Sequence, residues 1–310
     1  MLTTLIRIGI VGRGAAATSF VERLRAAEGV ALVGCADVDQ VATSALASLA
    51  SGPGPAAPVP AFADHAELIR EARPHALAIF TPSHAHYRPA MDGLQAGCHL
   101  LIEGPLSTIA QEAVDIVGVA RGRGLKVGVR HRLRHMPTLI AARDLVRSGA
   151  IGRVRLIEAS ISGGPASAGI ELIDALLWAS GSSAASVAAF QLPVDPGQDA
   201  VTSAVLRLAD GTLATIAVAG PGGPNAFSLV FDGERGQIRA TDSSLALETD
   251  PGESRLLAVG NGPEDVDANF VAALRSGTPL GCPAEQAVAT VRVLEAIARS
   301  AATGQFVGLG

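Results

Sequence analysis

The 310-residue chain contains few cysteines, few aromatic residues and no long apolar run. Its three cysteines, Cys35, Cys98 and Cys282, lie far apart and not in metal-like pairs, which favours a reducing compartment without a disulfide framework. No apolar stretch is long enough to span a bilayer, and the first twelve residues carry one positive charge, unlike a signal peptide. We therefore expect a cytoplasmic protein without membrane contacts or a metal site.

Charged residues are also scarce, at 17%, and the formal net charge is −5. No basic cluster stands out that would suit nucleic acid or an anionic membrane, so we expect neither as a partner. Hydrophobic residues, by contrast, make up 48% of the chain. This is enough apolar material and enough length for two domains of ordinary size.

The most informative stretch is Leu5–Ala17, LIRIGIVGRGAAA. Its β-branched apolar run predicts a buried strand, and the GRGAAA that follows fits the pattern G-x-G-x-x-G/A. Gly12 allows a tight turn and Gly14 lets the backbone approach a pyrophosphate, although similar glycine turns also end ordinary strands. A helix after the turn would offer its free N–H groups to phosphates. The residues expected to bind the cofactor here are Gly12, Gly14, Ala15 and Ala16.

A second predicted strand, Val30–Ala36, ends in Asp37, twenty residues after Ala17. An acidic side chain at this distance suits the 2′-hydroxyl of a cofactor ribose and would repel a 2′-phosphate. Asp37 therefore favours NAD over NADP. The alternative is an ordinary carboxylate in a turn.

Predicted strands and helices alternate as far as Val129, a pattern typical of a parallel, doubly wound α/β sheet. Ligands bind beyond the carboxyl ends of such strands. Short polar or glycine-containing segments occupy these ends in the sequence. They are Gly12–Ala15, Asp37, Thr81–His86, Glu103–Pro105 and Arg130–Arg132.

The second half of the chain has several short predicted strands with hairpin turns, and two helices at its end. It predicts an α+β domain with an open, mainly antiparallel sheet and helices on one face. We therefore expect a dinucleotide-binding domain over residues 1–126 and a substrate and oligomerisation domain over 127–310. The other sheet face would expose apolar surface, which a homo-oligomer formed sheet to sheet would cover.

The chain resembles the Gfo/Idh/MocA family of nicotinamide-dependent oxidoreductases over essentially its whole length. The resemblance implies an N-terminal Rossmann domain, an NAD(P) cofactor, and a C-terminal domain whose open sheet forms dimers or tetramers. The segments that carry it are GIVGRGAAA, ADVD (36–39), TPSHAH (81–86), AGCHLLIEGP (96–105), SGAIGRV (148–154) and GIELIDALLW (169–178).

The resemblance also assigns roles to the ends of two further strands. His86 matches a family histidine near the nicotinamide, although it could instead simply hydrogen-bond its loop. Glu103 fits the family's contact with the cofactor ribose. Thr81 and Pro82 belong to the same expected cofactor edge.

Two motifs depart from the family pattern. The family's Glu-Lys-Pro is here Glu103-Gly104-Pro105, so the lysine beside the nicotinamide is missing. The family's Asp-x-Gly-x-His-x-x-Asp has Ser167 for its first acid and Glu171 for its histidine, while Asp174 is kept. Removing a hydroxyl proton as hydride leaves needs such groups, and general acid–base help contributes about 10²–10⁴-fold.

The expected catalytic residues are Glu171, His86 and Asp174. Glu171 and Asp174 are three residues apart, hence on one face of a predicted apolar helix, where Glu171 could serve as acid or base. The alternative is a salt bridge from Glu171 to Arg130 or Arg132. The basic run that holds these arginines could contact substrate or form a solvated surface.

Three functions remain open at this point. The first is an NAD(P)-dependent oxidoreductase with degenerate lysine and histidine positions, acting on a small sugar-like, polyol or imine substrate. The second is a non-catalytic dinucleotide-binding sensor or regulatory protein. The third is a relative with tightly held NAD and non-redox chemistry.

Overall fold

The computed structural model describes residues 5–25, 27–52, 58–162, 168–192, 201–219, 226–249, 253–260 and 265–309. The chain divides into two compact units. Unit 1 comprises Met1–Arg130 and Val266–Val288, and unit 2 comprises His131–Asp265 and Ala289–Gly310. This division differs from the expected ranges 1–126 and 127–310 chiefly because a helical segment late in the chain returns to unit 1.

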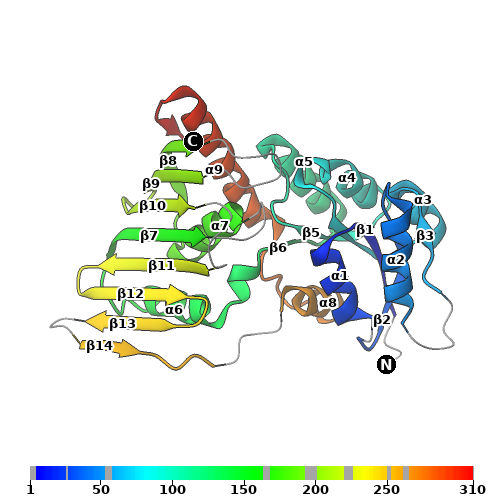
Figure 1. Cartoon of the computed structure of the whole chain (residues 1–310), viewed down its shortest axis with the longest axis horizontal. Helices are drawn as coiled ribbons and strands as arrows, with labels where there is room; N and C mark the ends of the chain where they lie inside the picture. The colour runs from blue at the N-terminus through cyan, green and yellow to red at the C-terminus, as the bar shows by residue number, and fades with distance from the viewer. Residues whose placement is uncertain are drawn as a thin grey trace. The chain divides into compact units, whose positions relative to one another are not determined.

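Unit 1 is built on a parallel six-stranded sheet with the order β3-β2-β1-β4-β5-β6. This is the Rossmann strand order, whose topological switch point lies between β1 and β4. Its strands are β1 Ile6–Gly12, β2 Val30–Ala36, β3 Ala61–Phe62, β4 Ala76–Phe80, β5 His99–Glu103 and β6 Val127–Arg130 (Figure 1).

Within the described residues, only some of the helices of unit 1 begin at a capping side chain. Asp39 and Asp64 cap two of them, accepting hydrogen bonds from backbone N–H groups of the first turn. Glu67, three residues after Asp64, accepts from the N–H of Ala63. The helices are α1 Ala15–Leu24, α2 Gln40–Ser51, α3 His65–Ala72, α4 Tyr87–Gln95, α5 Ala110–Arg123 and α8 Val266–Ser276.

Unit 2 is built on a nine-stranded sheet with the order β14-β13-β12-β11-β7-β10-β9-β8-β15. β7 and β10 run parallel and the other neighbouring strands antiparallel. The expected fold class, a Rossmann sheet followed by a mainly antiparallel open sheet, is therefore confirmed. The strands are β7 Val154–Ser162, β8 Ala184–Leu192, β9 Val201–Leu208, β10 Leu213–Val218, β11 Ala226–Gly233, β12 Gly236–Thr241, β13 Leu245–Thr249, β14 Glu253–Leu256 and β15 Val307–Gly308.

One face of this sheet carries the core of unit 2. Alternate residues of β7, β9 and β10, such as Ile157, Leu206 and Ile216, pack in one buried cluster with residues of the helices. The helices are α6 Pro137–Arg147, α7 Ala168–Ser180 and the part of α9 (Ala284–Thr303) that lies beyond residue 288. On the opposite face, apolar side chains of β8, β9 and β10 are exposed, among them Phe190 and Val205.

Two short strands and one helix start differ from the expectation. β14 and β15 are not foreseen from the sequence, because short edge strands are defined by their pairing and not by an apolar alternation. The sequence also predicts a helix over His84–Ala96, whereas the structure has a short 3-10 helix, Ser83–Ala85, followed by α4.

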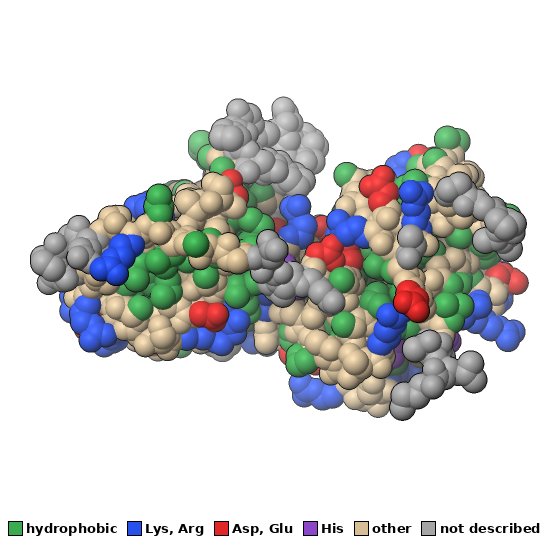
Figure 2. Space-filling model, turned by 90° about the horizontal axis from the view of Figure 1, so that it is seen from below, with side chains coloured by type: hydrophobic (Ala, Val, Ile, Leu, Met, Phe, Trp, Pro, Cys, Tyr) green, Lys and Arg blue, Asp and Glu red, His purple; other side chains and the backbone are tan. Residues whose placement is uncertain are grey.

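In the described part of the chain, no helix combines the length and apolarity needed to cross a membrane. On the face seen in Figure 2, positively and negatively charged side chains are interspersed among apolar ones.

Candidate functional site

The glycine turn of unit 1 joins β1 to α1 at the carboxyl edge of the sheet. Gly12 and Gly14 both have positive φ, +97° and +101°. A Cβ atom on Gly12 would lie 2.4 Å from the backbone of Phe80 and Thr81, so no other residue fits without moving β4. Gly14 opens onto free space and is the N-cap of α1, which no side chain caps within the described residues. The N–H groups at this helix end are suited to bind an anion.

A hollow of about 560 Å³ lies beside the turn, between α1 and α2. Its lining includes Arg13, Gly14, Thr18 and Leu46. The acid at the end of β2 lies close to it: Nε of Arg13 is 3.6 Å from an oxygen of Asp37, which also accepts from the N–H of Asp39 at 2.9 Å.

Arg13 also forms an ion pair with the side chain of Asp39. The N–H of Ala42 and the charge of Arg13 hold the pKa of Asp39 below its ordinary value. One arginine therefore lies between two carboxylates where the cofactor ribose is expected. A ribose hydroxyl at Asp37 would compete with Arg13.

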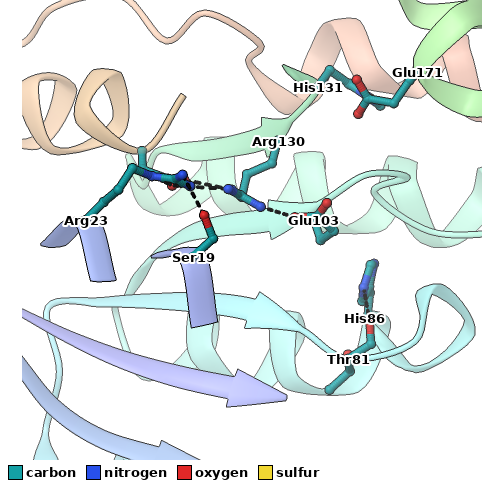
Figure 3. A network of polar contacts seen from close by, with 9 residues as sticks. Ser19, Arg23, Thr81, His86, Glu103, Arg130, His131 and Glu171 are labelled. Carbon is teal, nitrogen blue, oxygen red and sulfur yellow. Dashed lines mark hydrogen bonds and ion pairs between the residues drawn. The ribbon is translucent and has the colours of Figure 1, made fainter. Parts of the chain in front are cut away.

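His86 is buried and connects two loops at the carboxyl edge of the sheet. Its Nδ1 lies 2.9 Å from the carbonyl oxygen of Pro105, and its Nε2 lies 2.8 Å from that of Thr81 (Figure 3). Burial lowers the pKa of His86, although both carbonyls favour the protonated ring. This is the loop-bonding geometry considered above, and a role in proton transfer would require one of these contacts to open.

Glu103 and Arg130 end two neighbouring strands and form an ion pair (Figure 3). Arg130 also donates to both carboxylate oxygens of Asp267 on α8, at 2.7 and 3.1 Å, and its guanidinium lies 5.3 Å from the ring centre of Phe80. Arg23 of α1 pairs with the same Asp267. Burial opposes the charge of Arg130, but Glu103 and Asp267 outweigh it and raise its pKa.

The carboxyl edge of the sheet contains no lysine within the described residues. Gly104 follows β5, and the one lysine of the chain, Lys126, precedes β6. The N–H of Lys126 donates to Nδ1 of His99 at the start of β5, so Lys126 lies at the opposite edge from Glu103.

The second group of predicted residues lies in unit 2, where α7 brings Glu171 and Asp174 together. Asp174 is fully buried and accepts two hydrogen bonds from Arg134, at 2.6 and 2.7 Å, and one from Thr290 at 3.2 Å. Burial would raise the pKa of Asp174, but His131 and Arg134 outweigh it and lower the pKa. We call His131, Arg134, Glu171, Asp174 and Thr290 the α7 cluster.

Glu171 binds a histidine and a backbone group. One carboxylate oxygen lies 3.4 Å from Nδ1 of His131, and the other accepts from the N–H of Leu133 at 3.1 Å (Figure 3). The salt bridge expected with Arg130 or Arg132 is not the contact observed. Arg130 instead binds the carboxylates of Glu103 and Asp267.

Glu171 also lines a cavity of about 170 Å³ inside unit 2. Apolar side chains form most of its wall, and Arg132 and Asp242 add two further charges. The cavity is smaller than the roughly 300–1,000 Å³ usual for drug-sized ligands, so it suits only a small molecule. The lining residues are Arg132, Leu133, Met136, Ile161, Ala168, Glu171, Ala226, Phe227 and Asp242.

Sequence reasoning missed Asp267 and did not single out His131 and Arg134 within their basic run. Asp267 is buried, and so are Arg130, His131 and Arg134. The interpretation of the basic run as a solvated surface is therefore wrong for these last three residues. The only indication of these basic partners in the sequence is the acid pair on α7, since two carboxylates on a buried helix need positive charge such as an arginine beside them. Ser167, which stands at the family's first acid, lies outside the described residues.

Comparison with known proteins places these features in a family. Residues 6–131 match the Gfo/Idh/MocA family, described as an oxidoreductase family with an NAD-binding Rossmann fold. The chain is 28% identical to the uncharacterised oxidoreductase ORF334 of Rhizobium meliloti, covering 97% of this chain and 98% of that protein. It is 27% identical to the rhizopine catabolism protein MocA of the same organism, over 94% of each.

A solved structure has a similar fold. Levoglucosan dehydrogenase, in complex with NADH and levoglucosan, superposes with a TM-score of 0.83 at 17% identity, covering 98% of this chain and 99% of that one. Residues 6–131 of this chain therefore form the NAD-binding Rossmann domain of the Gfo/Idh/MocA oxidoreductase family.

Proposed function

We propose that the protein is an NAD-dependent oxidoreductase that acts on a small sugar-like, polyol or imine substrate. The observation that carries this proposal is the Gly12–Gly14 turn at the carboxyl edge of the six-stranded sheet. The turn admits no side chain at Gly12 and leaves the N-terminus of α1 open beside Gly14. It is therefore suited to hold the pyrophosphate of a dinucleotide.

The proposed cofactor contacts come from four strand ends of unit 1. The N–H groups around Gly14, Ala15 and Ala16 bind the pyrophosphate, and Asp37 binds the ribose hydroxyl. Bound NAD supplies the hydride acceptor for oxidation, or the donor for the reverse reaction. On the side of the nicotinamide we place Thr81, Pro82, His86 and Glu103.

The acid–base groups of the reaction are proposed to lie in unit 2, with Glu171 as the group that meets substrate and Asp174 as its neighbour. Glu171 lines a cavity, whereas Asp174 is bound on several sides by Arg134 and Thr290. The carboxylates of Glu171 and Asp242 disfavour an acidic substrate in this cavity. The solved relative described above was crystallised with a sugar derivative, levoglucosan.

A second function, dinucleotide binding without turnover, is favoured by one observation. Gly104 replaces the family lysine, and Lys126 lies at the wrong edge of the sheet to replace it. A sensor, or a relative with tightly held NAD and non-redox chemistry, would need no such group.

A turnover panel separates these functions. Sugars, polyols and imines are incubated with NAD or NADH, and the absorbance of NADH is followed for the wild type and for Gly104→Lys. We expect slow turnover of at least one substrate by the wild type. A rate above background only in Gly104→Lys would show a degenerate enzyme, and none in either would contradict the oxidoreductase proposal.

We also propose that the exposed face of the unit 2 sheet pairs with a second copy in a homodimer or homotetramer. Phe190, Val205 and Leu213 expose 79%, 48% and 48% of their surface there. The three cysteines are free and buried, which supports a reducing cytoplasmic location.

A further inference from the structure

His131 is the most enclosed titratable group of the α7 cluster. It follows β6 directly, and its ring is completely buried in unit 2. Both ring nitrogens face carboxylates: Nδ1 lies 3.4 Å from Glu171, and Nε2 lies 3.7 Å from Asp174. No function discussed so far uses this side chain.

The charges of the cluster balance only when His131 is protonated. Glu171 and Asp174 bring two negative charges, and Arg134 brings one positive charge. Thr290, which completes the cluster, is neutral. An unbalanced charge is costly in a buried environment, because no water is present to solvate it. A protonated His131 makes the net charge of the cluster zero.

We propose that His131 is the positioning residue for proton transfer: as an imidazolium that lies between two carboxylates, it holds the carboxylate of Glu171 fixed at the cavity wall. Glu171 then serves as the general base at the position where the family has a histidine. This inference rests on the oxidoreductase proposed above.

The geometry of Glu171 supports this role. One of its oxygens is engaged by His131 and the other by the N–H of Leu133, while the residue lines the 170 Å³ cavity. A base held in this way loses little freedom when substrate binds. The family histidine is therefore replaced by a carboxylate and an imidazolium from two different elements.

The chemical step balances with Glu171 as the proton acceptor. The substrate O–H bond breaks, and its proton is transferred to a carboxylate oxygen of Glu171. The electron pair of that bond forms the carbonyl as the C–H hydride leaves for the acceptor. His131 keeps its own proton throughout and stabilises the charge of Glu171 before the transfer.

The charged groups that face His131 favour its protonated form on balance. Burial and the nearby Arg134 disfavour the imidazolium, but Asp174 and Glu171 outweigh them and raise the pKa of His131. The histidine is therefore expected to stay protonated where ordinary histidines are neutral.

Nuclear magnetic resonance tests the clamp without any substrate. The full chain is labelled in its histidine rings, and His131 is titrated in the wild type, in Glu171→Gln and in Glu67→Gln. Glu67→Gln is the matched control, because it makes the same change at a helix cap of the other unit. His131→Gln assigns the signal.

We expect His131 to lose its proton above the ordinary histidine range in the wild type and in Glu67→Gln. In Glu171→Gln the titration should move to lower pH. A His131 that is neutral at pH 6.5, or that titrates identically in Glu171→Gln, would overturn the inference. Neither outcome depends on NAD binding or turnover, so the proposed function stands or falls separately.

A substrate from the turnover panel adds a kinetic readout. In His131→Gln, we expect kcat to fall by at least about tenfold, with a smaller change in KM. The pH–rate profile should also change, whereas a merely structural role would leave that profile unchanged. An unchanged profile in a folded variant would count against the positioning role. If His131→Gln does not fold, the titration in Glu171→Gln decides.

Discussion

At the scale of single residues, Gly12 is a position of unit 1 where neighbouring backbone atoms exclude any side chain. A Cβ atom at this position would lie 2.4 Å from the backbone of Phe80 and Thr81, so there is no room for one. Gly118 on α5 is the opposite case, since a Cβ there would meet nothing within 4 Å.

We predict that Gly12→Ala destabilises the protein by about 1–3 kcal/mol, because a backbone shift and an unfavourable φ are both forced on the turn. The variant should also bind NADH more weakly. Urea unfolding and a fluorescence titration measure the two effects. Gly118→Ala is the control, and we expect a gain of about 0.5–1 kcal/mol in its helix. Equal stability of Gly12→Ala and the wild type would show that the turn is not tight.

His131 makes a further residue-scale prediction, on pH dependence. Its pKa is raised in the folded protein, whereas an unfolded histidine titrates near 6.5. Between these two values the folded state holds one more proton than the unfolded state, so the free energy of unfolding falls as pH rises. This stability is fully present below pH 6.5 and is lost as pH rises through the folded value.

Burial lowers the pKa values of buried His86 and half-buried His99, which act in the opposite direction, so the change of total stability with pH combines several groups. The difference between wild type and His131→Gln isolates the contribution of His131. Urea unfolding at a series of pH values above 6 measures it. A difference that does not change with pH would contradict the assigned protonation.

At the scale of elements, α8 is tied to the carboxyl edge of the Rossmann sheet by charge as well as by packing. Asp267 is fully buried and binds Arg130 at the end of β6 and Arg23 of α1. One carboxylate thus joins a helix from late in the chain to two elements from its first half.

We predict that Asp267→Asn lowers the free energy of unfolding by about 3–5 kcal/mol, since it leaves the buried charge of Arg130 with half its compensation. Hydrogen exchange should also become faster in α8 than in α5. Glu22→Gln on the exposed side of α1 is the control, with an effect within about 0.5 kcal/mol. Exchange that rises uniformly over unit 1 would argue against a local tie.

Much of the fold follows from the sequence, and the reason lies in the elements themselves. Apolar patterns predict strands over Val30–Ala36, Ala76–Phe80 and Val154–Ser162 and a helix over Ala284–Thr303. β2, β4, β7 and α9 have these bounds, because such patterns report burial directly. β14 and β15 were missed, since their existence depends on a neighbouring edge.

The glycine turn could be placed because its chemistry is local. The partners of Arg130, His131 and Arg134 could not, because Asp267, Glu171 and Asp174 are 137, 40 and 40 residues away. Charge pairing over such distances leaves no periodic signal in one sequence. The alternative that the sequence offers for Glu171 is therefore a salt bridge to an arginine, whereas the structure shows a histidine beside it.

At the scale of the whole molecule, association depends on the exposed face of the unit 2 sheet. Phe190 and Val205 lie on the two antiparallel strands β8 and β9 on that face. Burying them between two copies would remove apolar surface from water.

We predict that the wild type sediments as a dimer or tetramer, and that Val205→Glu shifts it toward the monomer. A charge placed in an apolar interface must be desolvated without a partner, so Val205→Glu should weaken the association of the copies. Val41→Glu is the matched control, because it makes the same change at an exposed position on α2 of the other unit. Sedimentation velocity is the measurement, and a monomeric wild type at micromolar concentration would contradict the proposed association.

The central claim is that a dinucleotide binds at the glycine turn, and titration of the protein with NADH tests it most directly. Fluorescence should show saturable binding of NADH and weaker binding of NADPH, because Asp37 repels a 2′-phosphate. Ala15→Asp, which places a carboxylate at the start of α1, should weaken NADH binding by about tenfold or more. Failure of the folded wild type to bind either cofactor, or equal binding by Ala15→Asp, would contradict the account.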